Sequence, residues 1–157
     1  MRFSERYKII PLTESADVTT AGVDSQSVNV GKLHEICFLL NFGAITSNDT
    51  LIVYVGAATA TKTTAIAFKY RHAAADTKSA LSDTLGALTD SPSTGLVLAA
   101  TTFDHKLLVV EIDSQAIADA TPWVTLEIAG SASAQNVSIV AIAEPRFASN
   151  GGLPTVI

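Results

Sequence analysis

The stretch LHEICFLLNF, residues 33–42, carries the clearest structural signal in this chain of 157 residues. Successive side chains of an extended strand point to opposite faces, so every second residue shares a face. The more apolar of the two faces carries His34, Ile36, Phe38, Leu40 and Phe42. We expect this face to pack in the core of a β-sheet protein.

The same period of two recurs on both sides of this stretch, in short segments separated by polar turns. Residues 50–56 are apolar on both faces, which is typical of a central strand, and residues 73–95 predict a long surface excursion with a short strand near 84–88. One helical turn is expected within residues 114–120. The remaining strands are expected near residues 7–12, 27–30, 64–72, 96–100, 106–113, 122–128 and 136–144. About eight short strands separated by polar turns predict an all-β fold, namely an antiparallel β-sandwich of the jelly-roll type.

Length predicts a single domain, residues 1–157, and no motif in the sequence indicates a cofactor. Only 16% of residues are charged, against about 25% in average soluble domains, so much of the surface can be covered by a partner. The net charge of -5 argues against nucleic-acid binding, which needs clustered cations. The first residues lack the apolar core of a signal peptide, and no apolar run is long enough to span a membrane. Synthesis in the cytoplasm, without a membrane partner, is therefore expected.

Both ends of the sequence differ from its middle. Residues 1–12 and 145–157 contain Pro11, Pro145 and Pro154, and proline cannot join a central strand smoothly. We therefore expect an N-terminal arm and a C-terminal arm that pack on the core or reach onto a neighbouring protein. The partner-binding candidates are Arg2, Phe3, Arg6 and Tyr7 in the first arm and Phe147, Leu153, Val156 and Ile157 in the second.

Residues with catalytic or metal-binding potential lack the required spacing, so we predict no enzyme activity and no metal site. His34, His72 and His105 occupy ordinary strand or turn positions. Cys37 lies among apolar neighbours, which favours an inert thiol. Asp104 and His105, with Asp113 and Ser114, include the residue types of a catalytic triad but lack a nucleophile elbow, and residues 47–50 lack the alternation of a calcium loop.

Aromatic side chains offer one further alternative, a carbohydrate-binding platform. Trp123, Tyr54, Phe68 and Tyr70 could stack on sugar rings, but most of them are in phase with aliphatic residues. Core packing is the interpretation that the pattern favours.

Several segments resemble a family of small tailed-bacteriophage proteins that are virion structural components, similar to head decoration or cement proteins. They are MRFSERYKIIP at 1–11, NFGAI at 41–45, LIVYVGA at 51–57, TKTTAIAFKYR at 61–71, TFDHKLLVVEID at 102–113, PWVTLEI at 122–128 and RFASNGGLPT at 146–155. The resemblance spans nearly the whole chain, and its motifs are structural rather than catalytic.

This resemblance implies a capsid decoration or cement protein on the outer capsid surface of a virion. It implies a homo-oligomer, a homotrimer at local threefold positions, which binds the major capsid protein and reinforces the joints between capsomers. No binding residues of the family carry over, so the eight arm residues come from this sequence alone. A tail or head-to-tail connector component and a carbohydrate-binding module remain as alternatives.

Overall fold

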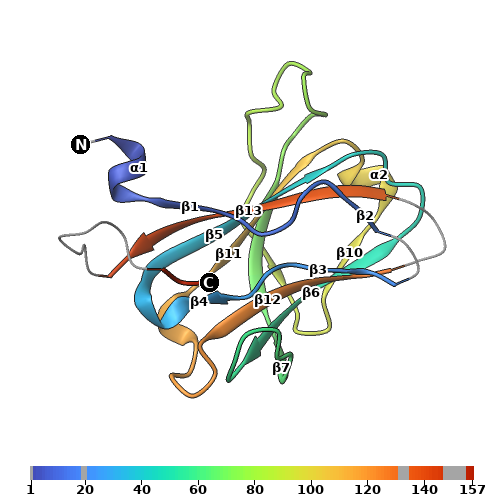
Figure 1. Ribbon diagram of the computed structural model, residues 1–157. Helices are drawn as coiled ribbons and strands as arrows, with labels where there is room; N and C mark the ends of the chain where they lie inside the picture. The colour runs from blue at the N-terminus through green and yellow to red at the C-terminus, as the bar shows by residue number, and fades with distance from the viewer. Residues whose placement is uncertain (1, 19–20, 131–134, 147–154) are drawn as a thin grey trace.

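Two antiparallel sheets stacked face to face form the body of the protein in a computed structural model, shown in Figure 1. The structure describes residues 2–18, 21–130, 135–146 and 155–157. The seven-stranded sheet contains, in spatial order, β1 (Lys8–Pro11), β13 (Gln135–Pro145), β5 (Leu33–Phe42), β11 (Leu107–Ile112), β8 (Phe68–His72) and β9 (Thr89–Ser91), with β2 (Ala16–Val18) also paired to β13.

The six-stranded sheet covers the inner face of the first. Its order is β10 (Leu96–Leu98), β6 (Asp49–Gly56), β12 (Trp123–Ala129) and β3 (Val23–Asp24), with β4 (Val28–Asn29) paired to β12 and β7 (Thr64–Ile66) paired to β6. Helical segments in the described residues are single turns, namely α1 (Phe3–Arg6), η1 (Val30–Lys32), α2 (Ala100–Phe103) and η2 (Ser114–Ala116).

Eight of these strands have jelly-roll connectivity. In chain order they are β1, β3, β5, β6, β10, β11, β12 and β13, and the first pairs with the last, the second with the seventh, the third with the sixth and the fourth with the fifth. Folding such a chain of nested pairs over itself gives two four-stranded sheets that share one core. The predicted antiparallel sandwich of the jelly-roll type is therefore confirmed.

The core follows the alternation that the sequence predicts along β5. Ile36, Phe38, Leu40 and Phe42 are all buried, and Leu40 pairs with Leu108 and Ile139 on its two neighbouring strands. His34 is exposed, so the prediction that it faces the core is wrong. The pairing of β5 with β13 shifts register between Glu144 and Pro145, and such a bulge turns the side chains beyond it to the other face.

The chain changes sheets where the sequence shows one uninterrupted alternation over residues 64–72. β7 pairs with β6 in the six-stranded sheet, and β8 pairs with β11 in the seven-stranded sheet, with only Ala67 between them. The extra short strands raise the number in the described residues to thirteen, against the eight predicted. The short strand expected near residues 84–88 lies instead at Thr89–Ser91, while the helical turn at Ser114–Ala116 is confirmed.

The long excursion projects from the body as the yellow-green loop in Figure 1. Its residue Leu81 is 64% exposed and has a φ of 68°, in the left-handed region that non-glycine residues rarely adopt.

Part of the predicted N-terminal arm belongs to the sandwich. Residues 8–11 form β1, whose partners on β13 run from Ala143 to Val140, and both Ile10 and Leu12 are buried. Pro11 is accepted because it ends an edge strand, where a missing N–H breaks no central ladder. The strand expected near residues 7–12 is therefore confirmed, whereas the arm expected over residues 1–12 is wrong for residues 8–12. Of the described residues in this range, those before β1 project from the body (Figure 1).

Candidate protein-docking surface

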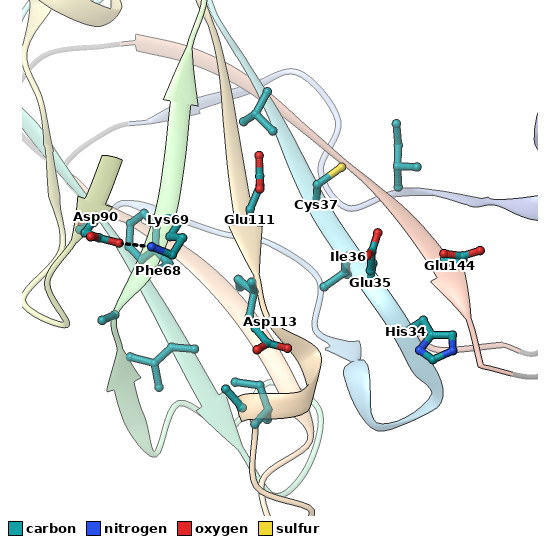
Figure 2. A pocket seen from close by; sticks show the side chains of 18 of the residues that line it. His34, Glu35, Ile36, Cys37, Phe68, Lys69, Asp90, Glu111, Asp113 and Glu144 are labelled. Atoms are coloured by element: carbon teal, nitrogen blue, oxygen red, sulfur yellow. Dashed lines mark hydrogen bonds and ion pairs between the residues drawn. The ribbon is translucent and has the colours of Figure 1, made fainter. Parts of the chain in front are cut away.

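A broad hollow lies across the seven-stranded sheet at the end where the sandwich is open. Its volume is about 890 Å³, and Figure 2 shows side chains from β13, β5, β11 and β8 around it. Its size falls within the range of about 300 to 1,000 Å³ that is usual for ligand pockets, which is room for several side chains of a partner.

The hollow opens because two strands of the sheet diverge. Pairing between β8 and β11 runs from the Leu108–His72 pair to the Glu111–Lys69 pair and then ends. Beyond this point the chain of β8 continues back through Ala67 to β7 in the other sheet, while β11 continues to Ile112 and η2. The gap between the two paths leaves this end of the sandwich uncovered by the described strands.

Apolar side chains form the floor of the hollow. Cys37 pairs with Ile142 on one side, and Val109 lies one row away, opposite Leu39. Cys37 is only partly buried, and burial is the main cause that raises the pKa of its thiol, with the carboxylates of Glu111 and Glu35 adding to the effect. The thiol therefore stays protonated at neutral pH, as expected for the inert role that the sequence predicts for this cysteine.

Carboxylates dominate the rim. Glu35, Asp90, Glu111, Asp113 and Glu144 all line the hollow, whereas Lys69 is the single lysine or arginine among its lining residues in the described chain. Figure 2 shows Glu35, Glu111 and Glu144 on three neighbouring strands. These charges give the hollow a negative potential, because like charges gathered at a concave surface reinforce one another.

Three basic side chains in or near the hollow form ion pairs with its carboxylates and neutralise part of this charge. Lys69 Nζ lies 2.6 Å from Asp90 Oδ1, and Arg6 Nε lies 3.1 Å from Glu144 Oε1. Arg71 Nε lies 3.2 Å from Glu111 Oε1, although its N–H has no well-aligned acceptor. Asp113 accepts a hydrogen bond from the backbone of Gln115.

Residues 2–7 carry the partner-binding candidates of the N-terminal arm. The helical turn α1 buries none of its residues, and Phe3 is 55% exposed. The ring of Phe3 lies 4.8 Å from that of Tyr7, and Arg6 lies 5.1 Å above the Tyr7 ring. Tyr7 also lines the hollow, so this segment leaves the body at the rim. The structure thus brings Phe3, Arg6 and Tyr7 together beside a surface that sequence reasoning missed.

The C-terminal candidates are separated from this cluster. Val156 is 1% exposed within the hydrophobic core, and its carbonyl accepts a hydrogen bond of 2.7 Å from the Asn29 N–H. The prediction that Val156 reaches onto a neighbouring protein is therefore wrong, because this residue packs on its own sandwich, and the C-terminus lies beside β4 in Figure 1. Ile157 is 45% exposed, and Phe147 and Leu153 lie outside the described residues.

The aromatic residues considered as a sugar platform do not form one cluster. Phe68 is buried and Tyr70 packs on the core, with its ring 6.4 Å from that of Phe103. Trp123 and Tyr54 are half-buried and alternate with fully buried residues, which places both on the outer face of the six-stranded sheet. The prediction of core packing is wrong for these two rings.

Residues with catalytic potential are dispersed. Asp104 and His105 precede β11, whereas Ser114 follows it and donates to the carbonyls of Leu33 and His34. The length of β11 separates these groups, so they form no triad. Over residues 2–18, 21–130, 135–146 and 155–157, no group of three or more His, Cys, Asp or Glu side chains could hold a metal ion. The same residues contain no helix of the length and apolarity needed to cross a bilayer.

A sequence signal for the hollow exists in hindsight. Cys37 and Leu39 lie on the face of β5 that points away from the core, and Val109 lies on the same side of the sheet in β11. Apolar residues on both faces of a strand indicate that the second face is also covered or available for contact.

Comparison with known proteins gives structural likeness only. No protein-family model matches the chain, and no curated protein matches it. The crystal structure of the SPBc2 prophage-derived protein YomS is similar with a TM-score of 0.41 and 12% sequence identity, over 87% of this chain and 92% of that chain. A chain in the structure of the infectious bursal disease virus Gt strain is similar with a TM-score of 0.23 and 15% identity, over 90% of this chain and 41% of that chain.

Proposed function

We propose that this protein is a structural component of a bacteriophage virion that binds the outer surface of the capsid and reinforces it. It acts without catalysis, as a capsid decoration or cement protein. Its partners are the major capsid protein and further copies of itself, arranged as a homotrimer at local threefold positions. Its place is the capsid surface, which it reaches after synthesis in the host cytoplasm.

The observation that carries this proposal is the hollow on a stiff jelly-roll frame, bordered by the exposed segment of residues 2–7. A protein that only coats a lattice needs a rigid body and surfaces that other proteins can cover. Each contact can be weak, because lattice symmetry repeats it many times and multivalent attachment is far tighter than a single contact. The resemblance of the sequence to tailed-phage structural proteins supports the same assignment.

Electrostatics support a protein partner over nucleic acid. The net charge is -5, and carboxylates outnumber cations around the hollow. A surface that follows phosphates needs the opposite sign. The exposed Arg6 lies over the Tyr7 ring, and the exposed Arg2 precedes Phe3 in the chain, a combination of residue types that is enriched at protein interfaces.

The test is to add purified protein to capsids that lack it and to examine the particles by cryo-electron microscopy and co-sedimentation. We expect density on the outer capsid surface at local threefold positions, and saturable binding. Density at the tail or at the head-to-tail connector would instead support the alternative virion role. Absence of the protein from every part of the particle would refute the proposal.

A carbohydrate-binding module is the second candidate, favoured by the shared outward face of Trp123 and Tyr54. Aromatic rings on one flat sheet face can stack on sugars. On a glycan array, specific binding that Trp123→Ala abolishes would favour this function. If the wild-type protein binds no glycan, the carbohydrate-binding function is excluded.

A further inference from the structure

We propose that the hollow is the docking site for residues 2–6 of a second copy of this chain. The inference rests on the proposed self-assembly and names the surfaces that perform it. The segment and the hollow lie next to each other on the molecule, since Tyr7 belongs to the rim and the residues before it project outward. Each copy can therefore place its segment in the hollow of the next copy, and three such head-to-tail contacts close a ring.

Charge complementarity selects this occupant. The segment carries Arg2 and Arg6, and since Arg6 pairs with Glu144 of its own chain, Arg2 is the cation that a second copy can receive. The single acidic residue of the segment, Glu5, accepts a hydrogen bond of 2.7 Å from the Arg2 backbone N–H. The hollow is lined by five carboxylates, and Lys69, Arg6 and Arg71 pair with three of them, so Glu35 and Asp113 are the two without an ion pair in the described residues. Glu35 is exposed and has no ion pair within 4.0 Å in the described part of the chain. Arg6 of the same chain acts on Glu35 only at longer range, so an incoming arginine would meet this carboxylate without breaking an ion pair.

Apolar surface is complementary as well. Phe3 stands 55% exposed at the tip of the segment, and the floor of the hollow offers Cys37 and Ile142. The volume of about 890 Å³ accommodates an aromatic ring together with an arginine side chain. Arginine and aromatic side chains are the usual anchors of protein interfaces, because they bury a large area and retain directional contacts.

A second copy fits better than the molecule's own segment. Within one chain, Arg6 is already fixed at the rim by Glu144, and Phe3 lies against Tyr7. These contacts leave Phe3 exposed and the hollow open. Association of two copies covers both surfaces at once. Each exchanged segment is short and buries much less than the roughly 800 Å² per partner of a standard interface, so a single contact is weak and the closed ring supplies the stability.

The test is charge reversal, read out as molar mass against concentration by sedimentation equilibrium on the full chain. Arg2→Glu and Glu35→Arg should each weaken self-association at least tenfold, and deletion of residues 2–6 should do the same. The double variant Arg2→Glu/Glu35→Arg should recover to within about threefold of wild type, since the reversed charges again attract. Lys78→Glu is the matched control, because it makes the same charge change in the projecting loop and should leave association unchanged.

Several outcomes would overturn the proposal. Self-association that none of these variants alters would place the interface elsewhere, and a wild-type chain that remains monomeric at about 1 mM would exclude even a weak contact. Absence of recovery in the double variant would exclude a direct charge contact. If the wild type is monomeric and Glu35→Arg abolishes capsid binding, the occupant is a capsid protein segment. In that case the self-docking proposal fails, but the proposed capsid role stands. Normal self-association of a protein that does not bind capsids would support self-docking and refute the capsid role.

Discussion

The variant Val156→Ala tests whether the C-terminal residues 155–157 pack on the core of their own chain or reach a neighbouring protein. The Val156 side chain is 1% exposed among the core residues. Truncation to alanine removes two methyl-sized groups, which contribute about 0.8 kcal/mol each when buried, and the remaining cavity adds to the loss. The free energy of unfolding should therefore fall by about 2 to 3 kcal/mol, with no direct effect on assembly.

Urea denaturation followed by circular dichroism measures this change, and Ile157→Ala is the control in the same tail. Ile157 is 45% exposed, so its truncation should change stability by less than about 0.5 kcal/mol. Removal of residues 155–157 should cost more than Val156→Ala, because the Asn29 N–H also loses its acceptor. If Val156→Ala leaves the denaturation curve unchanged and instead weakens assembly, the tail is an intersubunit arm and the packing described above does not hold.

Three further predictions concern single interactions. In the core, Gln135 donates a hydrogen bond to the carboxylate of Asp49, and each side chain keeps one unpaired oxygen. Asp49→Leu and Gln135→Met should each lower the free energy of unfolding by about 1 to 3 kcal/mol, and the double variant should lower it by less than their sum. Urea denaturation measures these losses, and strictly additive values would contradict the coupling. The raised pKa of Cys37 lowers the fraction of its thiol that is ionised. At pH 8, Ellman's reagent should therefore react more slowly with the folded protein than with the urea-unfolded protein, and equal rates would contradict the raised pKa. Lys62 forms surface ion pairs with Glu127 and Asp24. Lys62→Met should therefore lower the free energy of unfolding by no more than about 1 kcal/mol, and by less in about 1 M salt. A loss of the same size at both salt concentrations would argue against an electrostatic origin.

The sequence alone determined the fold class and most of the core. Alternation along residues 33–42 predicted which face of this strand is buried, because a strand places every second side chain on the same side regardless of what lies across the sheet. The apolar run at 50–56 predicted a central strand, and β6 indeed has neighbours on both sides. The polar turns between segments separated the strands of the jelly-roll frame.

The tertiary structure decided where this alternation stops. The register shift at Glu144 exposes His34, and the crossing at Ala67 divides one apparent strand between two sheets. Val156 follows Pro154 in an apolar segment that the sequence could assign equally to the core or to a neighbour, and only its position beside β4 resolves this.

The hollow likewise depends on how far β8 and β11 stay paired before they diverge. The period of side chains along a strand is a local property of the backbone, so the sequence determines it. Bulges, sheet crossings and the hollow between diverging strands depend on which distant segments lie side by side, and only the folded chain specifies those neighbours.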